Sequence, residues 1–120
     1  MPRRRDGHLL VLEAEILATG LELQNTGTPF HGFLLASRMA GDGARPLTAH
    51  GTLYKALARM TAAGLLEAEW EEPSISEREG RPRRRLYRVT GAGSLALAHH
   101  REREAAATLP TAVFGKPVTT

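Results

Sequence analysis

A cluster of arginines dominates the segment GRPRRRLYRVT, which begins at Gly80. Its first four arginines are Arg81, Arg83, Arg84 and Arg85. So many guanidinium groups cannot all be buried, and in a compact turn they repel one another. A polyanion would relieve this repulsion, and each phosphate that the arginines neutralise would release condensed counterions. The segment is therefore interpreted as a phosphate-binding turn, with an ordinary solvated turn as the alternative.

A second polar surface is expected on a helix that begins at about residue 48 and runs to about residue 63. Its apolar face carries Ala49, Leu53, Ala56, Leu57 and Met60. The opposite face carries Thr52, Lys55 and Arg59, about one helical turn apart. Arg59 could bond a guanine bidentately, whereas Lys55 is better suited to a phosphate. The alternative is an amphipathic surface helix whose outer face is polar because it meets water.

Three more residues of this helix complete the candidate DNA-binding set. Thr48 is a candidate N-cap, because its hydroxyl can accept a backbone N–H of the first turn. His50 and Tyr54 lie on a flank of the polar face, where the tyrosine hydroxyl could donate to a phosphate oxygen. Gly64 is well placed to end the helix in a left-handed conformation.

Two shorter helices are predicted before this one. The spacing of Leu9, Leu12 and Ile16 predicts a helix over residues 9–18. Glycines and a proline then predict a loop over residues 20–29. A short helix follows over residues 31–40, with Phe33 and Leu34 on its apolar face.

A β-hairpin is predicted after residue 64, where the apolar period changes from 3.6 to 2. Leu66, Ala68 and Trp70 point one way, and the glutamates at 67, 69 and 71 point toward solvent. A long turn over residues 72–82 leads into a second strand, in which Tyr87 and Val89 share one face. Trp70 is expected in the core, and it is also a candidate for binding a small-molecule effector.

The order of elements is helix, helix, helix, strand, strand, helix. This order predicts a mostly α fold with a small β-hairpin, the winged helix-turn-helix, in which a helix enters the major groove and the hairpin lies along the backbone. We expect a mobile basic arm at 1–7, a DNA-binding domain at 8–90, a dimerisation helix at 91–109 and a tail at 110–120. On that last helix, Leu95, Ala98, Ala105 and Leu109 form one apolar stripe.

Composition excludes several other classes of protein. The chain has 120 residues, a net charge of +3 and no cysteine, which fits a reducing cytoplasm and excludes thiolate chemistry. No apolar run approaches the roughly 18 residues that span a bilayer. His99 and His100 are adjacent, so on a helix they point about 100° apart and cannot share one metal ion. No nucleophile motif or phosphate loop is present, so we expect no cofactor, no metal and no enzyme activity.

The segments GTLYKALARMTAAGLLEAEWEE and GRPRRRLYRVTGAGSLAL carry a family resemblance. Their order and spacing strongly resemble the PadR family of transcriptional regulators over residues 30–97, and His31, Gly32 and Phe33 resemble that family's His-Gly-Tyr. The resemblance implies a dimeric winged-helix repressor that binds inverted-repeat operators and releases DNA when a small molecule binds. It also implies DNA contacts from Tyr54 and the arginines of the hairpin, and a dimer built by the first and last helices.

The sequence departs from the family pattern in three places. The loop after the first helix is longer than usual, the last helix is poor in large apolar residues, and Gly91 stands where the family has an acidic residue. Val113 and Phe114 in the tail are candidates for docking on a partner subunit. The remaining alternative to duplex DNA is an acidic protein partner bound by the basic hairpin without operator specificity.

Overall fold

A computed structural model describes residues 8–40 and 50–108 of the chain. The predicted arm at 1–7, the candidate cap Thr48 and the predicted tail at 110–120 lie outside these ranges. The helices are α1 (Val11–Asn25), α2 (Gly32–Ala40), α3 (His50–Ala62), α4 (Pro73–Glu79) and α5 (Gly91–Thr108). The strands are β1 (Leu66–Trp70) and β2 (Arg85–Val89). The predicted winged-helix order is therefore confirmed, with one additional helix inside the hairpin.

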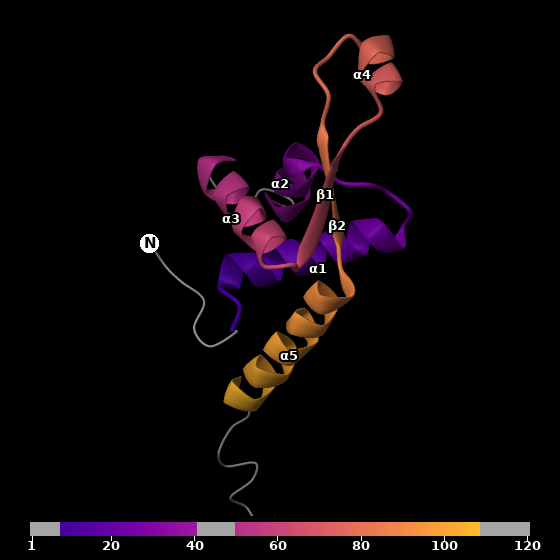
Figure 1. The fold of residues 1–120 in the computed structure, drawn as a ribbon. Coiled ribbons are helices and arrows are strands. Elements are labelled where there is room, and N and C mark those ends of the chain that lie inside the picture. Colours follow the sequence, from indigo (N-terminus) through magenta and orange to yellow (C-terminus); the bar gives the residue numbers. More distant parts are fainter. Residues whose placement is uncertain (1–7, 41–49, 109–120) are drawn as a thin grey trace, which may run out of the picture.

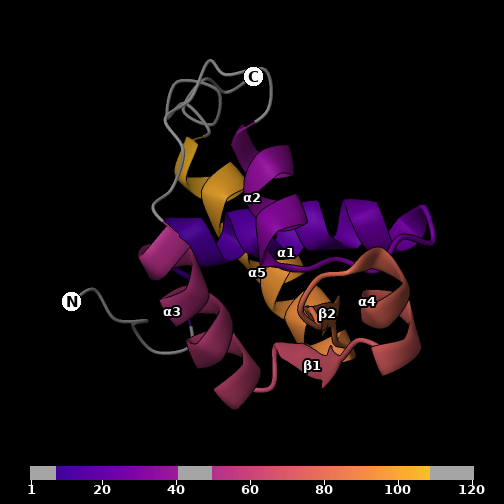
Figure 2. The same ribbon diagram turned by 90° about the horizontal axis from the view of Figure 1, so that it is seen from above.

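Helix α1 lies across the molecule, with α2 and α3 packed on it (Figures 1 and 2). The β1–β2 hairpin stands beside these helices and extends past them to α4, which forms its tip (Figure 1). Helix α5 leaves from the opposite end of the hairpin and packs its beginning against α1. The hairpin tip and α5 therefore lie at opposite ends of the molecule.

The core lies where α1, α2, α3 and the hairpin meet. The predicted apolar face of α3 is confirmed, since Leu53, Ala56, Leu57 and Met60 are all buried. Gly64 ends that helix with a φ of +81°, as predicted. Other large buried side chains include Ile16, Leu17, Leu23, Phe30, Leu35 and Leu66. Apolar burial of this kind is the main favourable term that holds the three helices together.

The hairpin is antiparallel, with Leu66 opposite Val89 at its base and Trp70 opposite Arg85 at its outer end. A third segment joins it, because Tyr87 N–H donates to Phe30 O at 2.9 Å and the two residues form an isolated β-bridge. The two aromatic rings stack with centroids 6.3 Å apart. Phe30 therefore fixes the start of α2 against the second strand of the hairpin.

The prediction of a loop from residue 20 was wrong, because α1 continues to Asn25. Gly20 was interpreted as a helix breaker, yet it is a close-packing residue inside the helix. A Cβ atom at this position would lie 2.8 Å from the Phe30 ring and 3.1 Å from the Val89 side chain. Packing thus outweighs the poor helix propensity of glycine, and the connection to α2 is not unusually long.

The buried face of α2 differs from the prediction, and the stripe predicted on α5 lies away from the core. On α2 the buried residues are Gly32, Leu35 and Ala36, and Leu34 is partly buried against the core, whereas Phe33 is 62% exposed. On α5 the residue that enters the core is Leu97, while Leu95 is 58% exposed. Gly93 permits this close approach, because a Cβ atom there would overlap the carbonyl oxygen of Leu65.

The long turn predicted over residues 72–82 contains α4. Pro73 occupies the first turn of this helix, where its missing N–H costs nothing. Gly80 ends the helix in a left-handed conformation with φ of 65°. Two further predictions fail nearby, since Trp70 is 55% exposed instead of in the core and Glu71 is buried instead of facing solvent.

Candidate nucleic-acid interface

Helix α3 presents its polar side to solvent. Thr52 and Lys55 are exposed on it, as the sequence predicts. His50 is the first residue of the helix. Tyr54 is 45% exposed, and its ring lies directly against Gly32 at the start of α2, where a Cβ atom would overlap the ring. The packing of α2 therefore fixes Tyr54 at the edge of the α3 surface.

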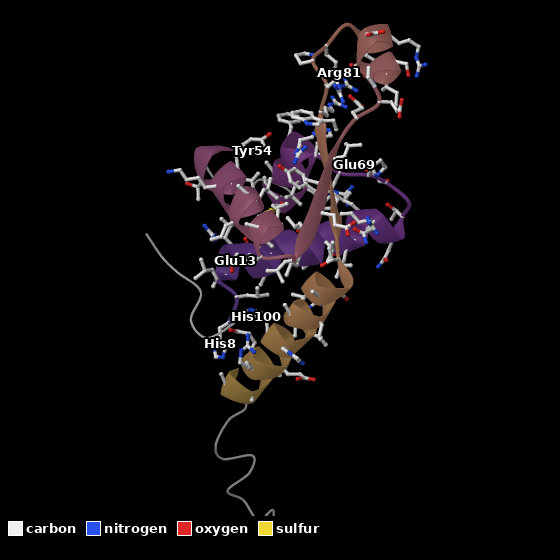
Figure 3. All side chains as sticks on the ribbon, in the orientation of Figure 1. His8, Glu13, Tyr54, Glu69, Arg81 and His100 are labelled. Carbon is white, nitrogen blue, oxygen red and sulfur yellow. The ribbon has the colours of Figure 1, made fainter. Side chains whose placement is uncertain are left out.

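Arg59 lies in a different environment from Thr52 and Lys55. Its Nε donates to Glu13 Oε2 at 2.8 Å, and the Glu13 side chain is fully buried. The other carboxylate oxygen, Oε1, accepts the backbone N–H of Leu10 at 2.9 Å. Glu13 thus joins the beginning of α1 to the side of α3 (Figure 3). A base contact from Arg59 would require this ion pair to open.

Arg81 is likewise held by carboxylates. Its Nη1 and Nη2 donate to Glu71 Oε1 and Oε2 at 2.7 and 2.9 Å, and its Nε donates to Glu79 at 2.9 Å. The bidentate bond from Arg81 is the main cause that lowers the pKa of Glu71 to about 2. The backbone N–H of Arg84 also donates to Glu71 Oε1, at 3.3 Å. Glu71 therefore fixes the return of the chain from α4 into β2.

The next three arginines, Arg83, Arg84 and Arg85, are called here the wing arginines. Within residues 8–40 and 50–108 none of them has a carboxylate partner, and the same holds for Lys55. Arg83 donates from Nε to the backbone oxygen of Glu71 at 3.2 Å. The guanidinium carbons of Arg83 and Arg85 lie 5.6 and 5.0 Å from the centroid of the Trp70 ring, within the range of a cation–π contact. These positive charges remain available to an anion.

The pKa values of two neighbouring residues show how close the wing arginines come to the helices. The pKa of His31 is lowered, first by burial and then by the positive charges of Arg84 and Arg81. The pKa of Tyr87 is raised mainly by burial. The positive charge of Arg85 lowers this pKa, and the neighbouring Tyr54 raises it. His31 Nδ1 accepts the N–H of Leu34 at 3.4 Å, so this histidine caps α2. The outer end of the hairpin and the α3 surface around Tyr54 therefore belong to one region of the molecule.

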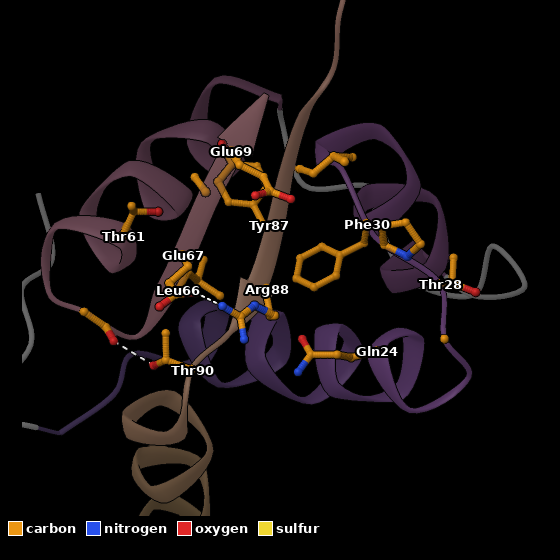
Figure 4. Close-up of a pocket in the computed structure, with 15 residues that line it drawn as sticks. Gln24, Thr28, Phe30, Thr61, Leu66, Glu67, Glu69, Tyr87, Arg88 and Thr90 are labelled. Carbon is orange, nitrogen blue, oxygen red and sulfur yellow. Dashed lines mark hydrogen bonds and ion pairs between the residues drawn. The ribbon is translucent and has the colours of Figure 1, made fainter. Parts of the chain in front are cut away.

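A separate open groove of about 750 Å³ lies on the hairpin beside the end of α1 (Figure 4). Phe30, Leu86 and Tyr87 belong to its apolar lining, and Glu67 and Arg88, which form an ion pair, also line it. Gln24 pairs with the backbone of Val89, accepting its N–H at 2.8 Å. Trp70 does not line this groove. The sequence did not predict the groove, because Gln24 fell in a segment interpreted as a loop.

Helix α5 carries exposed apolar side chains away from the core. Leu95 and Ala98 are exposed one turn apart, and Val11 at the start of α1 is 72% exposed.

None of the described helices is both long enough and apolar enough to cross a membrane. In the same part of the chain no three His, Cys, Asp or Glu residues gather as a metal site would need.

Three residues of the interface were missed at the sequence level: Glu13, Glu71 and Gly32. Glu13 had a detectable signal, because it occupies a core position of the periodicity that also includes Leu9, Ile16 and Leu17. A carboxylate at such a position indicates a buried partner. Glu71 and Gly32 had no comparable local signal, because their partners Arg81 and Tyr54 are distant in the sequence.

The three-helix body with its antiparallel hairpin defines a winged-helix protein of the kind that binds DNA. Residues 21–99 match the model of the transcriptional regulator PadR-like family. The chain belongs to this family of transcriptional regulators, which are DNA-binding proteins and not enzymes. No curated protein matches the chain.

Solved structures of similar fold include several transcriptional regulators. A regulator from Clostridium thermocellum is 20% identical, with a TM-score of 0.67 over 88% of this chain and 90% of that one. A PadR family regulator from Clostridium difficile is 19% identical, with a TM-score of 0.63 over 80% and 88%. A PadR family regulator from Eggerthella lenta is 27% identical, with a TM-score of 0.53 over 89% and 86%.

Proposed function

We propose that this protein represses transcription by binding an inverted-repeat operator in duplex DNA as a homodimer. One observation carries the proposal: Lys55 on the exposed side of α3 and the wing arginines of the hairpin lack carboxylate partners within the described ranges. An exposed polar helix beside a basic hairpin suits a major groove and the adjacent phosphates. The protein would act in the cytoplasm, where such DNA lies.

The roles of the candidate residues differ with their environment. Thr52 and Lys55 are assigned to the groove, and the Tyr54 hydroxyl is assigned to a phosphate. Arg83, Arg84 and Arg85 are assigned to phosphates, because their charge is not already neutralised. Arg59 and Arg81 are assigned to positioning, since Glu13 and Glu71 hold them.

A dimer is needed to read an inverted repeat, because each copy supplies one α3 helix to one of the two half-sites. We assign the dimer contact to the exposed stripe of α5 that contains Leu95 and Ala98. Two α3 helices about 34 Å apart would match successive major grooves on one side of the duplex. A small-molecule effector would release DNA by binding preferentially to a dimer with a different spacing.

The proposal is tested by selecting duplexes from fragmented genomic DNA and measuring the affinity of the wild type at several salt concentrations. A linear and steep fall of log K with log[salt], together with preference for one fragment over an unrelated duplex of equal length, is expected. A slope near zero contradicts phosphate binding. Equal affinity for the fragment, the unrelated duplex and a polyglutamate chain would favour the alternative, an interaction with an acidic partner.

A further inference from the structure

Trp70 is the only tryptophan in the chain. It ends β1 and lies opposite Arg85 in the register of the hairpin. Leu66 on the same face of β1 is buried and Ala68 is half-buried, but the hairpin extends past α2 and α3 toward α4 (Figure 1). Trp70, the last residue of β1, is not part of the core. More than half of its surface is therefore exposed. Burial does not account for a large aromatic side chain at this position.

Two arginine side chains lie against the Trp70 ring. The Arg83 and Arg85 guanidinium carbons are 5.6 and 5.0 Å from its centroid. A cation–π contact uses the face of a guanidinium group, so its in-plane N–H groups can still donate to phosphate oxygens. In Arg83 these are the Nη groups, because its Nε donates to the backbone oxygen of Glu71. Tryptophan is also the aromatic residue that attracts cations most strongly. The contact therefore restrains the two side chains without consuming the donors that a phosphate needs.

We propose that Trp70 is a positioning residue, which holds Arg83 and Arg85 in place so that phosphates meet side chains that are already ordered. A free arginine loses much rotamer freedom when it is fixed at an interface, and this loss weakens binding. Trp70 removes part of that loss before DNA arrives. The inference rests on the proposed function, since it assigns the arginines to phosphates.

The first experiment uses the free protein and needs no DNA. In NMR spectra of the wild type, the ring current of Trp70 shifts the side-chain protons of Arg83 and Arg85 upfield of their values in Trp70→Leu. Relaxation of the Arg85 Nε–H vector shows lower mobility in the wild type than in that variant. Trp70→Phe keeps a ring and shows intermediate shifts. Identical arginine shifts and mobilities in the wild type and Trp70→Leu overturn the proposal.

The second experiment measures affinity for a duplex that the wild-type protein enriches from a random-sequence pool. Trp70→Leu is expected to bind it about tenfold more weakly, which corresponds to about 1.4 kcal/mol. Trp70→Phe stays within about threefold of the wild type, because phenylalanine also attracts cations. Arg88→Gln serves as the control for charge on the hairpin, since Arg88 pairs with Glu67 and does not contact Trp70.

A double-mutant cycle separates positioning from a general loss of structure. Arg85→Gln weakens binding strongly in the wild type and only slightly in the Trp70→Leu background, because that background has already lost the ordered arginine. Equal losses in both backgrounds, or Trp70→Leu binding as tightly as the wild type, overturn the role of Trp70 while DNA binding itself stands. If the wild type enriches no duplex, the proposed function fails, and the positioning role fails with it.

Discussion

The ring of Tyr54 and the backbone of Gly32 are in direct contact, and no side chain larger than hydrogen fits between them. The two residues belong to different helices, since Gly32 begins α2 and Tyr54 lies in α3. This contact sets the distance between the helices at the edge of the candidate interface. It also gives a physical reason for the His-Gly-Phe segment at residues 31–33, which the sequence alone offered only as a resemblance.

Gly32→Ala is therefore expected to lower stability by about 1–3 kcal/mol, the usual cost of overpacking a tight contact. Thermal or urea unfolding measures the change. The matched control is Gly51→Ala, because nothing lies within 4 Å of the position its Cβ would occupy. Alanine there should raise stability by about 0.5–1 kcal/mol through helix propensity. Equal effects of the two substitutions would contradict the role of the Tyr54 contact.

Replacing Arg59 with alanine tests whether this residue reads bases or supports α3. Loss of the hydrogen-bonded ion pair with the buried Glu13 should cost about 1–3 kcal/mol of folding stability. Affinity for all duplexes should then fall by a similar factor, with the preferred sequence unchanged. Urea unfolding and selection from a random pool measure the two effects. A changed sequence preference at full stability would instead return Arg59 to the role of a base reader. Lys55→Ala is the comparison, because Lys55 has no such partner in the described ranges.

The sequence predicted those features whose signal is local. Leu53 and Leu57 recur at helical spacing, so α3 was found with the correct buried face. Leu66 and Ala68 alternate with glutamates, so β1 was also found, but on its predicted buried face only Leu66 is buried and Trp70 is exposed. Gly20 was misjudged because its local preference for ending a helix is overruled by packing against Phe30. That packing depends on Phe30 joining β2 at Tyr87, a contact between distant segments.

The candidate site was predicted only in part, again because the sequence shows local patterns but not contacts between distant residues. The positions of Thr52, Lys55 and the arginines follow from periodicity and from the turn at Gly80. The sequence does not show which arginines are neutralised, because this depends on the contacts of Glu13 with Arg59 and of Glu71 with Arg81. The alternation of β1 assigned Glu71 to solvent, but the strand ends at Trp70, so the alternation no longer applies there.

Glu71 should make stability depend on pH in the acid range. Its pKa in the folded protein is about 2, below the ordinary value of 4.5. The stabilisation from its bonds is therefore complete above about pH 4.5 and is lost as the pH falls toward 2. Urea unfolding between pH 2.5 and 6 should show a steeper acid loss in the wild type than in Glu71→Gln. Glu69→Gln serves as the control and should keep the wild-type profile. Parallel profiles of the wild type and Glu71→Gln would contradict this assignment.

The salt dependence of DNA binding should separate the wing arginines from Arg81. Replacing Arg84 with glutamine should reduce the slope of log K against log[salt] by about one unit, because one phosphate contact is lost. Arg81→Gln should change the slope less and lower stability more, since Glu71 already neutralises Arg81. Fluorescence anisotropy at several salt concentrations measures both slopes. If Arg81→Gln lowers the slope as much as Arg84→Gln does, Arg81 contacts phosphate.

The oligomeric state should depend on the exposed stripe of α5. Leu95→Lys places a charge in the assigned dimer contact, where burying it would be costly, so the dimer should dissociate into folded monomers. Ser94→Lys adds the same side chain one residue away, off the stripe, and should remain dimeric. Sedimentation velocity measures the assembly, and circular dichroism checks that both variants stay helical. A loss of operator affinity in Leu95→Lys alone should accompany dissociation, because two half-sites are then bound by separate molecules. If both variants remain dimeric, the contact lies elsewhere.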